Sequence, residues 1–349
     1  MNAPKTLPHI AKARLDGLVY PAIRAVVVHE AEEHDLELAE NSDERIVMET
    51  EYGHYNFEPN EGGCVVKVQS DRADNLFVLK DSLVESIAHF APDAAKALAW
   101  SDAGATGALP PNFQLVTVQS VAPLGTDFLR VTIKAPDLTA FQNAAIHFRI
   151  ILPPRGLSTP EWPFVNDKGV TVWPKAEKAL HKPVYTVRSA DADTGLLTFD
   201  VYQHEGGRTT DWSQSVTPGA KVGLTGPGGG GVPDTKAITI YADETGFPAV
   251  ARLLEGLAPD STGRVVLKSQ NGKDCDYPMP FHANLVPEWH HGADIESLAD
   301  LAIADRDTYA NHMLWFATEK EDVLKLRTFC KGSGIDTKAH YIATYWSRT

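Results

Sequence analysis

Cysteine is scarce in this chain, which has only three among 349 residues: Cys64, Cys275 and Cys330. None of them forms a CxxC pair, so the usual cysteine motifs for zinc, iron-sulfur clusters and redox exchange are excluded, and three are too few for a disulfide framework. Runs of lysine and arginine are also missing, and 46 acidic residues against 32 basic ones give a net charge of −14. We therefore expect no nucleic-acid partner and no general attraction to anionic membranes.

Long apolar runs are missing as well. No stretch approaches the roughly 18 residues of a membrane span, and the first 17 residues lack the apolar core of a signal peptide. We expect no membrane insertion and a cytoplasmic protein, either a monomer or a weak dimer. The composition is that of an ordinary globular protein, with 43% hydrophobic and 22% charged residues, and the length predicts two to three domains.

Residues 1–104 predict a small α+β domain. Short runs alternate apolar and polar positions and are typical of strands, namely RAVVVHEA, RIVMETE, YGHYNFEP and GCVVKVQS. A helix follows, because apolar residues recur at three- and four-residue steps: Leu76, Leu79, Leu83, Ile87 and Phe90. The stretch SDAGATGALPPN, residues 101–112, has no apolar period and predicts a linker.

Residues 112–234 predict an antiparallel β-barrel. Six β-rich runs are separated by proline, glycine and aspartate: FQLVTVQSV, FLRVTIKAP, IHFRIILPP, PVYTVRSA, LLTFDVYQH and KVGLTGP. Residues 153–183 are rich in proline and tryptophan without a period, which predicts a long ordered loop, often a functional feature. GPGGGG at 226–231 lacks the GK[ST] ending of a triphosphate loop, so we interpret it as a flexible connector.

Residues 235–349 predict an α/β domain with a doubly wound parallel sheet. Strand patterns at AITIYAD, RVVLKSQ, HMLWFATE and HYIATYW alternate with helical patterns at FPAVARLLEGL and around residues 322–329. The turn after the first strand, DETGFP, offers Thr245 as an N-cap and Pro248 in the first helical turn. This turn suits the approach of a nicotinamide or a flavin edge; the alternative is a plain capped helix start.

Two clusters on the predicted barrel carry hydrogen-bond donors. In the first, Tyr185–Arg188, the tyrosine ring suits an isoalloxazine or ribityl chain and the Thr186 hydroxyl suits the flavin edge; the alternative is an ordinary surface strand. In the second, a strand enters glycines and a helix start, where Gly207, Arg208, Thr209 and Thr210 suit a phosphate. Its alternative is a glycine turn with a capped helix.

These segments together resemble a known family. YTVR at 185–188, the segment with His204, Gly207 and Trp212, GPGG at 226–229, DETGFPA at 243–249, WFATE at 315–319 and the terminal YW resemble the siderophore-interacting proteins. These are FAD-dependent, NAD(P)H-linked ferric-siderophore reductases related to ferredoxin-NADP reductases, and the resemblance covers roughly residues 112–349. Residues 14–100, with HFAP at 89–92 and Trp100, separately resemble a small domain of unknown function that accompanies iron-uptake genes.

The resemblance implies an oxidoreductase in which FAD takes a hydride from NADPH or NADH and reduces a ferric siderophore or other ferric chelate. No resident metal is expected. FAD binding is predicted for Tyr185, Thr186, Val187, Arg188, His204, Gly207, Arg208, Thr209, Thr210, Thr245 and Trp346. Nucleotide binding is predicted for Thr245, Gly246, Lys268, Lys273 and Glu319, and capture of the anionic chelate for Lys134, Arg188 and Arg348. The alternative for the lysines is ordinary solvation, and for Trp346 packing of the last strand.

The sequence departs from the family pattern at three places. Pro183 stands where the family usually has an arginine that clamps the FAD diphosphate, and Lys182 or Arg208 is a candidate replacement. Gly207-Arg208-Thr209 replaces Gly-Pro-Ala, and Ser347 separates the terminal Tyr345-Trp346 from Arg348. The competing interpretations are a non-catalytic siderophore- or flavin-binding protein of iron uptake, and a structural partner in an iron-uptake complex.

Overall fold

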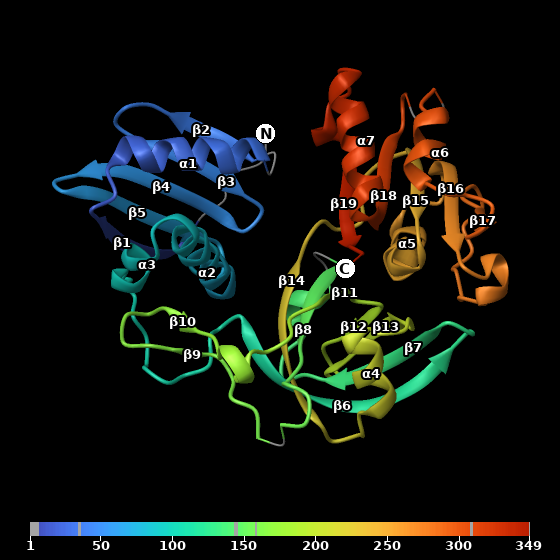
Figure 1. The fold of residues 1–349 in the computed structure, drawn as a ribbon, viewed down its shortest axis with the longest axis horizontal. Coiled ribbons are helices and arrows are strands. Elements are labelled where there is room, and N and C mark those ends of the chain that lie inside the picture. Colours follow the sequence, from blue (N-terminus) through green and yellow to red (C-terminus); the bar gives the residue numbers. More distant parts are fainter. Residues whose placement is uncertain (1–6, 34–35, 143–145, 158, 308–309, 349) are drawn as a thin grey trace. The chain divides into compact units, whose positions relative to one another are not determined.

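The computed structural model describes residues 7–33, 36–142, 146–157, 159–307 and 310–348. The chain divides into two compact units (Figure 1). The first comprises the chain up to Gln114 together with Pro153–His181, and the second comprises Leu115–Leu152 and Lys182–Thr349. Neither unit is therefore continuous in sequence, because the long proline- and tryptophan-rich segment belongs to the first unit and interrupts the second.

The first unit is an α+β structure. Its antiparallel sheet runs in the order β1 (His9–Asp16), β5 (Gly63–Ser70), β4 (Gly53–Asn60), β3 (Ile46–Thr50) and β2 (Glu37–Asn41). The helices are α1 (Tyr20–Glu33), α2 (Ala73–Phe90) and α3 (Pro92–Ala97). Strand alternation sends every second side chain into one core shared with these helices, for example Ala11, Ala13, Leu15, Tyr55, Phe57, Val66 and Val68.

One predicted strand of this unit is wrong. RAVVVHEA lies inside α1 rather than in a strand. Ile23, Val27 and Ala31 are buried at four-residue steps, so the helical period and the contact with the sheet outweigh the β-propensity of three successive valines. The predicted helix at residues 76–90 is confirmed as α2, with Leu76, Leu79, Leu83 and Ile87 buried.

The predicted linker and the predicted long loop bind each other. Short strands β9 (Phe164–Val165) and β10 (Thr171–Val172) pair within the loop, and Val165 exchanges backbone hydrogen bonds with Gly107 and Ala108. Asp102 accepts from Nζ of the buried Lys80 at 2.7 Å, which fastens the linker to α2. Residues 104, 112 and 234 stay predictions as domain boundaries.

The second unit begins with an antiparallel barrel, as predicted. The strand order is β11 (Val184–Thr186), β8 (His147–Ile151), β14 (Lys221–Gly228), β6 (Phe113–Leu124), β7 (Phe128–Lys134), β13 (Leu196–Tyr202) and β12 (Ser189–Asp191). The edge strands β11 and β12 are consecutive in the chain. Val187 N–H donates to Ile146 and Arg188 N–H donates to Thr198, so residues 184–191 bridge both edges and close the barrel.

A parallel sheet with helices on both faces completes this unit, which confirms the doubly wound prediction. Its order is β17 (Pro287–His291), β16 (Thr262–Ser269), β15 (Ala237–Ala242), β18 (Met313–Glu319) and β19 (Tyr341–Trp346). On β15, Ile238 and Ile240 face the core that contains α5 (Phe247–Gly256), whereas Tyr241 faces the core of α6 (Leu298–Ala304) and α7 (Lys320–Gly332). The pattern at residues 322–329 lies within α7, while β17 and α6 were not predicted.

The glycine-rich run is only partly a connector. Gly226, Pro227 and Gly228 belong to β14, and Gly228 pairs with His147 after a bulge. Gly229 has φ +72°, and a Cβ there would lie 2.8 Å from Cδ2 of His147. Glycine is therefore needed at this position both for the backbone conformation and for the close approach of the histidine ring.

Candidate functional site

A cleft of about 450 Å³ lies between the barrel and the parallel sheet, both within the second unit. The barrel contributes residues of β8, β11 and β13, and the sheet contributes residues after β15 and along β19. This is the carboxyl edge of the parallel strands, where open α/β sheets commonly bind ligands. The cleft is lined by aromatic rings, hydroxyl groups and a few charged side chains.

The first wall consists of β8 and the neighbouring β11. His147 and Arg149 are two residues apart on β8, so both face the cleft while Phe148 and Ile150 face the barrel core. In the antiparallel register Val184 lies opposite Arg149, and Tyr185 lies opposite Phe148. Arg149 Nη1 donates to the carbonyl of Lys182 at 3.0 Å, which holds an exposed guanidinium beside Lys182 and Pro183.

His147 is the centre of a buried hydrogen-bonded group at the back of the cleft. Its Nε2 lies 3.1 Å from Oη of Tyr345 and 3.4 Å from Oη of Tyr341, and its Nδ1 lies 3.5 Å from Oγ1 of Thr186. Burial lowers the pKa of His147 to about 4, so the imidazole is neutral at neutral pH. This group joins β8, β11 and β19 without a net charge.

Asp243 fastens the last strand to the turn after β15. Its Oδ2 accepts from Nε1 of Trp346 at 2.7 Å and from the Thr318 hydroxyl at 2.5 Å. Its Oδ1 accepts from the backbone N–H and hydroxyl of Thr245, at 3.0 and 2.5 Å. Burial raises the pKa of Asp243 despite these donors. The carboxylate thus fixes the indole of Trp346 at the cleft and caps the turn. The predicted N-cap Thr245 is therefore wrong, because Asp243 is the N-cap and Thr245 is one of its donors.

The floor of the cleft contains a second carboxyl group. Glu244 accepts from the backbone N–H of Gln270 at 2.6 Å and from the Tyr202 hydroxyl at 3.4 Å. Burial is the largest cause of its raised pKa. Tyr202 stacks with His204, with ring centroids 6.2 Å apart and an interplanar angle of 24°. His204 is exposed and lines the cleft.

The predicted phosphate turn lies at the start of α4 (Arg208–Ser215), with Gly207 as its N-cap. Thr209 is buried and hydrogen-bonds Tyr185, which itself lines the cleft. Thr210 is buried and its hydroxyl bridges the carbonyl of Tyr202 and the N–H of His204. Arg208 begins the helix and is not among the residues that line the cleft.

Two members of the Tyr185–Arg188 cluster face elsewhere. Val187 is fully buried in the barrel core, and its carbonyl accepts from Arg252 at 2.8 Å. Arg188 makes a two-pronged ion pair with Glu255 on α5, at 2.9 and 2.7 Å, with only 12% of its side chain exposed. Tyr185 and Thr186 line the cleft, so the structure brings together half of this cluster.

A second pocket of about 370 Å³ lies next to the cleft and shares Glu244 and Trp346 with it. Lys268, Glu319 and Arg348 line it. Lys268 Nζ donates to the Glu296 carbonyl at 3.0 Å, and Glu319 accepts from the backbone N–H of Arg348 at 3.2 Å. Thr245 lines the first cleft only. Three other predicted residues line neither pocket: the buried Gly246 and the exposed Lys134 and Lys273.

The sequence analysis missed His147, Arg149, Tyr202 and Tyr341 as cleft residues. A signal for the first two was present, because IHFRI places His147 and Arg149 at alternate positions of an apolar run, and polar residues there face away from the core. Tyr341 and Tyr345 likewise share one face of β19 with Ala343. Which barrel strand faces the last strand depends on the tertiary structure.

Within the described ranges, no group of three or more His, Cys, Asp or Glu side chains is placed to hold a metal ion. In the same part of the chain, none of the helices combines the length and apolar character needed to cross a membrane.

The family matches cover most of the chain from residue 117 onward, which includes the segment Pro153–His181 of the first unit. Residues 117–231 match the siderophore-interacting FAD-binding domain, and residues 235–349 match the siderophore-interacting protein model. The NADPH-dependent ferric-chelate reductase of Escherichia coli (strain K12) is 26% identical over 245 residues, which cover 67% of this chain and 92% of that protein. The ferric acinetobactin reductase of Acinetobacter baumannii is 27% identical over 177 residues, covering 47% and 59%.

Solved structures agree in fold. The siderophore-interacting protein SipS from Aeromonas hydrophila superimposes with a TM-score of 0.55 at 20% identity, covering 68% of this chain and 99% of that one. A siderophore utilization protein from T. fusca superimposes with a TM-score of 0.57 at 24% identity, covering 70% and 96%. Two successive family matches and the shared barrel and parallel sheet confirm the resemblance inferred from the motifs: the chain belongs to the siderophore-interacting protein family.

Proposed function

We propose that this protein is an FAD-dependent reductase that uses NADPH or NADH to reduce a ferric siderophore or a similar ferric chelate. The observation that carries the proposal is the donor set of the 450 Å³ cleft, together with the FAD-binding family match on the same residues. Aromatic rings and hydroxyl groups line the cleft, and Arg149 and Lys182, which also line it, supply positive charge.

These residues fit FAD by their chemistry. Tyr185 and Thr186 would contact the flavin ring and its edge, and the guanidinium and ammonium groups of Arg149 and Lys182 would bind the diphosphate. Bound FAD would supply the ability to take up two electrons as a hydride and to deliver them singly to Fe(III). Fe(II) prefers softer ligands than the hard oxygens of most siderophores, so the reduced iron is released more readily.

Arg149 is proposed as the diphosphate clamp that Pro183 cannot supply. The family arginine would stand at position 183, on the segment leading into β11. Ile150 N–H donates to the Pro183 carbonyl at 3.2 Å, and Arg149 lies opposite Val184, so the guanidinium emerges from the neighbouring strand at almost the same level. In this proposal, Arg149 supplies from the neighbouring strand the forked donor geometry that Lys182 lacks.

The remaining cleft residues would hold the bound groups in position and would exclude water. The neutral His147 and its two tyrosine partners form an uncharged back wall, which lowers the cost of placing an apolar ring against it. Asp243 holds the Trp346 indole in place, where it would cover the side at which a nicotinamide approaches. Burial raises the pKa of Glu244 on the cleft floor, so this carboxyl group would hold a proton more readily than an exposed one.

The second pocket is proposed for the nicotinamide nucleotide and the chelate. Lys268 and Arg348 line it and carry positive charge, while Glu319, Glu321 and Asp322 carry negative charge. Arg348 would attract an anionic chelate. Lys134 and Lys273 stand outside both pockets, so Lys268 is the better candidate for the 2′-phosphate of NADPH. Because the reaction consumes NAD(P)H, the cytoplasm remains the predicted compartment.

The test is steady-state turnover. Purified protein supplied with FAD should oxidise NADPH or NADH only when a ferric catecholate or ferric hydroxamate is present, with Fe(II) trapped by a chromogenic chelator in a ratio of two per nucleotide. A protein that turns yellow with FAD but produces no Fe(II) with either chelate would instead be the non-catalytic binding protein. A protein that ignores added FAD would refute both interpretations of the cleft. Equal rates with both nucleotides would remove the role proposed for Lys268.

A further inference from the structure

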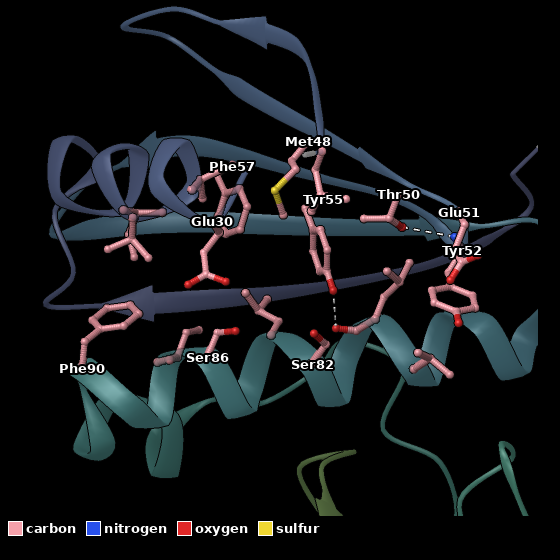
Figure 2. A pocket seen from close by; sticks show the side chains of 18 residues that line it. Glu30, Met48, Thr50, Glu51, Tyr52, Tyr55, Phe57, Ser82, Ser86 and Phe90 are labelled. Atoms are coloured by element: carbon pink, nitrogen blue, oxygen red, sulfur yellow. Dashed lines mark hydrogen bonds between the residues drawn. The ribbon is translucent and has the colours of Figure 1, made fainter. Parts of the chain in front are cut away.

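A cavity of about 630 Å³ lies in the first unit, and the residues that line it all precede the segments that the family matches cover (Figure 2). It is a half-open pocket walled by α1, by α2 and by β3, β4 and the turn between them, and it meets solvent near the exposed Glu51, Ser82 and Phe90. Protein interiors rarely contain voids much larger than a water molecule, whereas pockets of about 300–1,000 Å³ are typical of small-molecule sites. The volume of this pocket lies within the range of such sites.

The body of the cavity is apolar. Ile23 and Val27 of α1, Met48 and Phe57 of the sheet, and Leu83 and Ile87 of α2 line it. Tyr55 contributes its apolar ring to the wall of the cavity, because its hydroxyl is engaged in a 2.8 Å hydrogen bond to the Leu79 carbonyl, marked by a dashed line in Figure 2. The occupant must therefore have a mostly apolar body whose burial drives its binding.

The polar groups of the cavity select the charge of the occupant. Figure 2 shows the Glu30 carboxylate pointing from α1 toward α2, where Ser86 faces it, and Ser82 lies one turn earlier on the same helix. Among the described lining residues there is no lysine or arginine, whereas Glu30 and Glu51 are acidic. A carboxylate accepts hydrogen bonds and repels anions, so the cavity favours a molecule with an N–H or O–H donor and disfavours an anion.

We propose that this cavity binds a neutral, largely apolar small molecule that donates an N–H or O–H hydrogen bond to Glu30. The volume is large enough for a molecule of two or three rings. An anionic ferric siderophore does not meet these conditions, so the cavity is a binding site separate from the redox cleft, and its role does not depend on the proposed reductase activity.

Two dyes with one skeleton test this proposal on the full chain. N-phenyl-1-naphthylamine is neutral, apolar and carries one N–H group, and 8-anilinonaphthalene-1-sulfonate adds a sulfonate to the same rings. Both brighten when they leave water. The neutral dye should bind saturably with a Kd on the order of 10 µM, as expected for a ligand of this size. The sulfonate should bind about tenfold more weakly because Glu30 repels it.

Three variants locate the site. Ser86→Phe places a ring in the cavity and should abolish binding of the neutral dye, whereas Ala88→Phe puts the same ring on an exposed position of α2 that does not line the cavity, and should leave binding unchanged. Glu30→Gln should reduce the preference for the neutral dye over the sulfonate from about tenfold to about twofold, because the charge is lost and the size is kept.

The outcomes are decisive in both directions. No saturable signal in the wild type, equal binding by Ser86→Phe, displacement of the dye by excess FAD, or an unchanged preference in Glu30→Gln would each overturn the proposal. Thermal unfolding of each variant shows whether it is folded. If Ser86→Phe is not folded, the change of preference in Glu30→Gln, which needs no added volume, decides the question.

Discussion

Replacing Arg149 by alanine tests how this chain holds FAD. Arg149 is exposed on β8, and its guanidinium is held beside Lys182 by a 3.0 Å hydrogen bond to the Lys182 carbonyl. The substitution removes this side-chain hydrogen bond to a carbonyl that precedes β11, and it leaves the side-chain packing of the barrel core unchanged. A loss of FAD affinity would therefore report a contact with FAD rather than damage to the barrel.

The magnitude follows from the chemistry of the lost contact. A charge-assisted hydrogen bond to a phosphate contributes about 1.5–3 kcal/mol, which corresponds to a Kd for FAD about 10- to 150-fold higher. Solvent at the cleft mouth screens the exposed guanidinium and favours the lower half of this range. Arg149→Lys should recover only part of the affinity, because an ammonium group lacks the forked geometry.

The assay is a titration of apoprotein with FAD, followed by the quenching of flavin fluorescence. Lys134→Ala serves as the matched control, since it removes one exposed barrel charge outside both pockets and should leave the Kd unchanged. Arg208→Ala tests the replacement suggested by the sequence. An unchanged Kd in Arg149→Ala with a large loss in Arg208→Ala would refute the cross-strand clamp and assign the diphosphate to the start of α4.

Three further predictions concern the cleft and the neighbouring second pocket. Burial lowers the folded-state pKa of His147 from 6.5 to about 4, so the native state is destabilised as the pH falls from 6.5 toward 4. His147→Gln removes this titrating group, so urea unfolding curves of the variant should show about 3 kcal/mol less loss of stability over that pH range. If the variant and the wild type lose stability equally as the pH falls, the burial argument is contradicted. Asp243→Asn should lower the free energy of unfolding by about 2–4 kcal/mol, because the new amide NH₂ group is a donor that faces the donors of Thr318 or Trp346 and leaves them without an acceptor. A change below about 1 kcal/mol would show that the cluster rearranges. Arg348→Ala should raise the KM for an anionic ferric chelate, and added salt should raise the KM of the wild type in the same way. The rate of flavin reduction by NAD(P)H alone should stay unchanged. A salt-independent KM would mean that shape or apolar contact holds the chelate.

The sequence by itself determined the class of each part of the fold. Alternation in runs such as FLRVTIKAP and strand-helix repeats after residue 235 are local properties, because side-chain direction has a period of two in strands and 3.6 in helices. The motifs around Tyr185, Gly207 and Asp243 were likewise readable in sequence order, and their combined order identified the family.

The tertiary structure decided which side chains meet. The three valines of α1 became helical because Ile23, Val27 and Ala31 pack on strands β2 to β5, which come later in the chain. Arg188, predicted at the flavin, pairs with Glu255 some 67 positions away, whereas Arg149 lies next to Pro183 only through the register of β8 and β11. No sequence motif indicates the cavity between α1 and α2. Such features depend on long-range pairing and on the angles at which elements pack, and local periodicity carries information on neither.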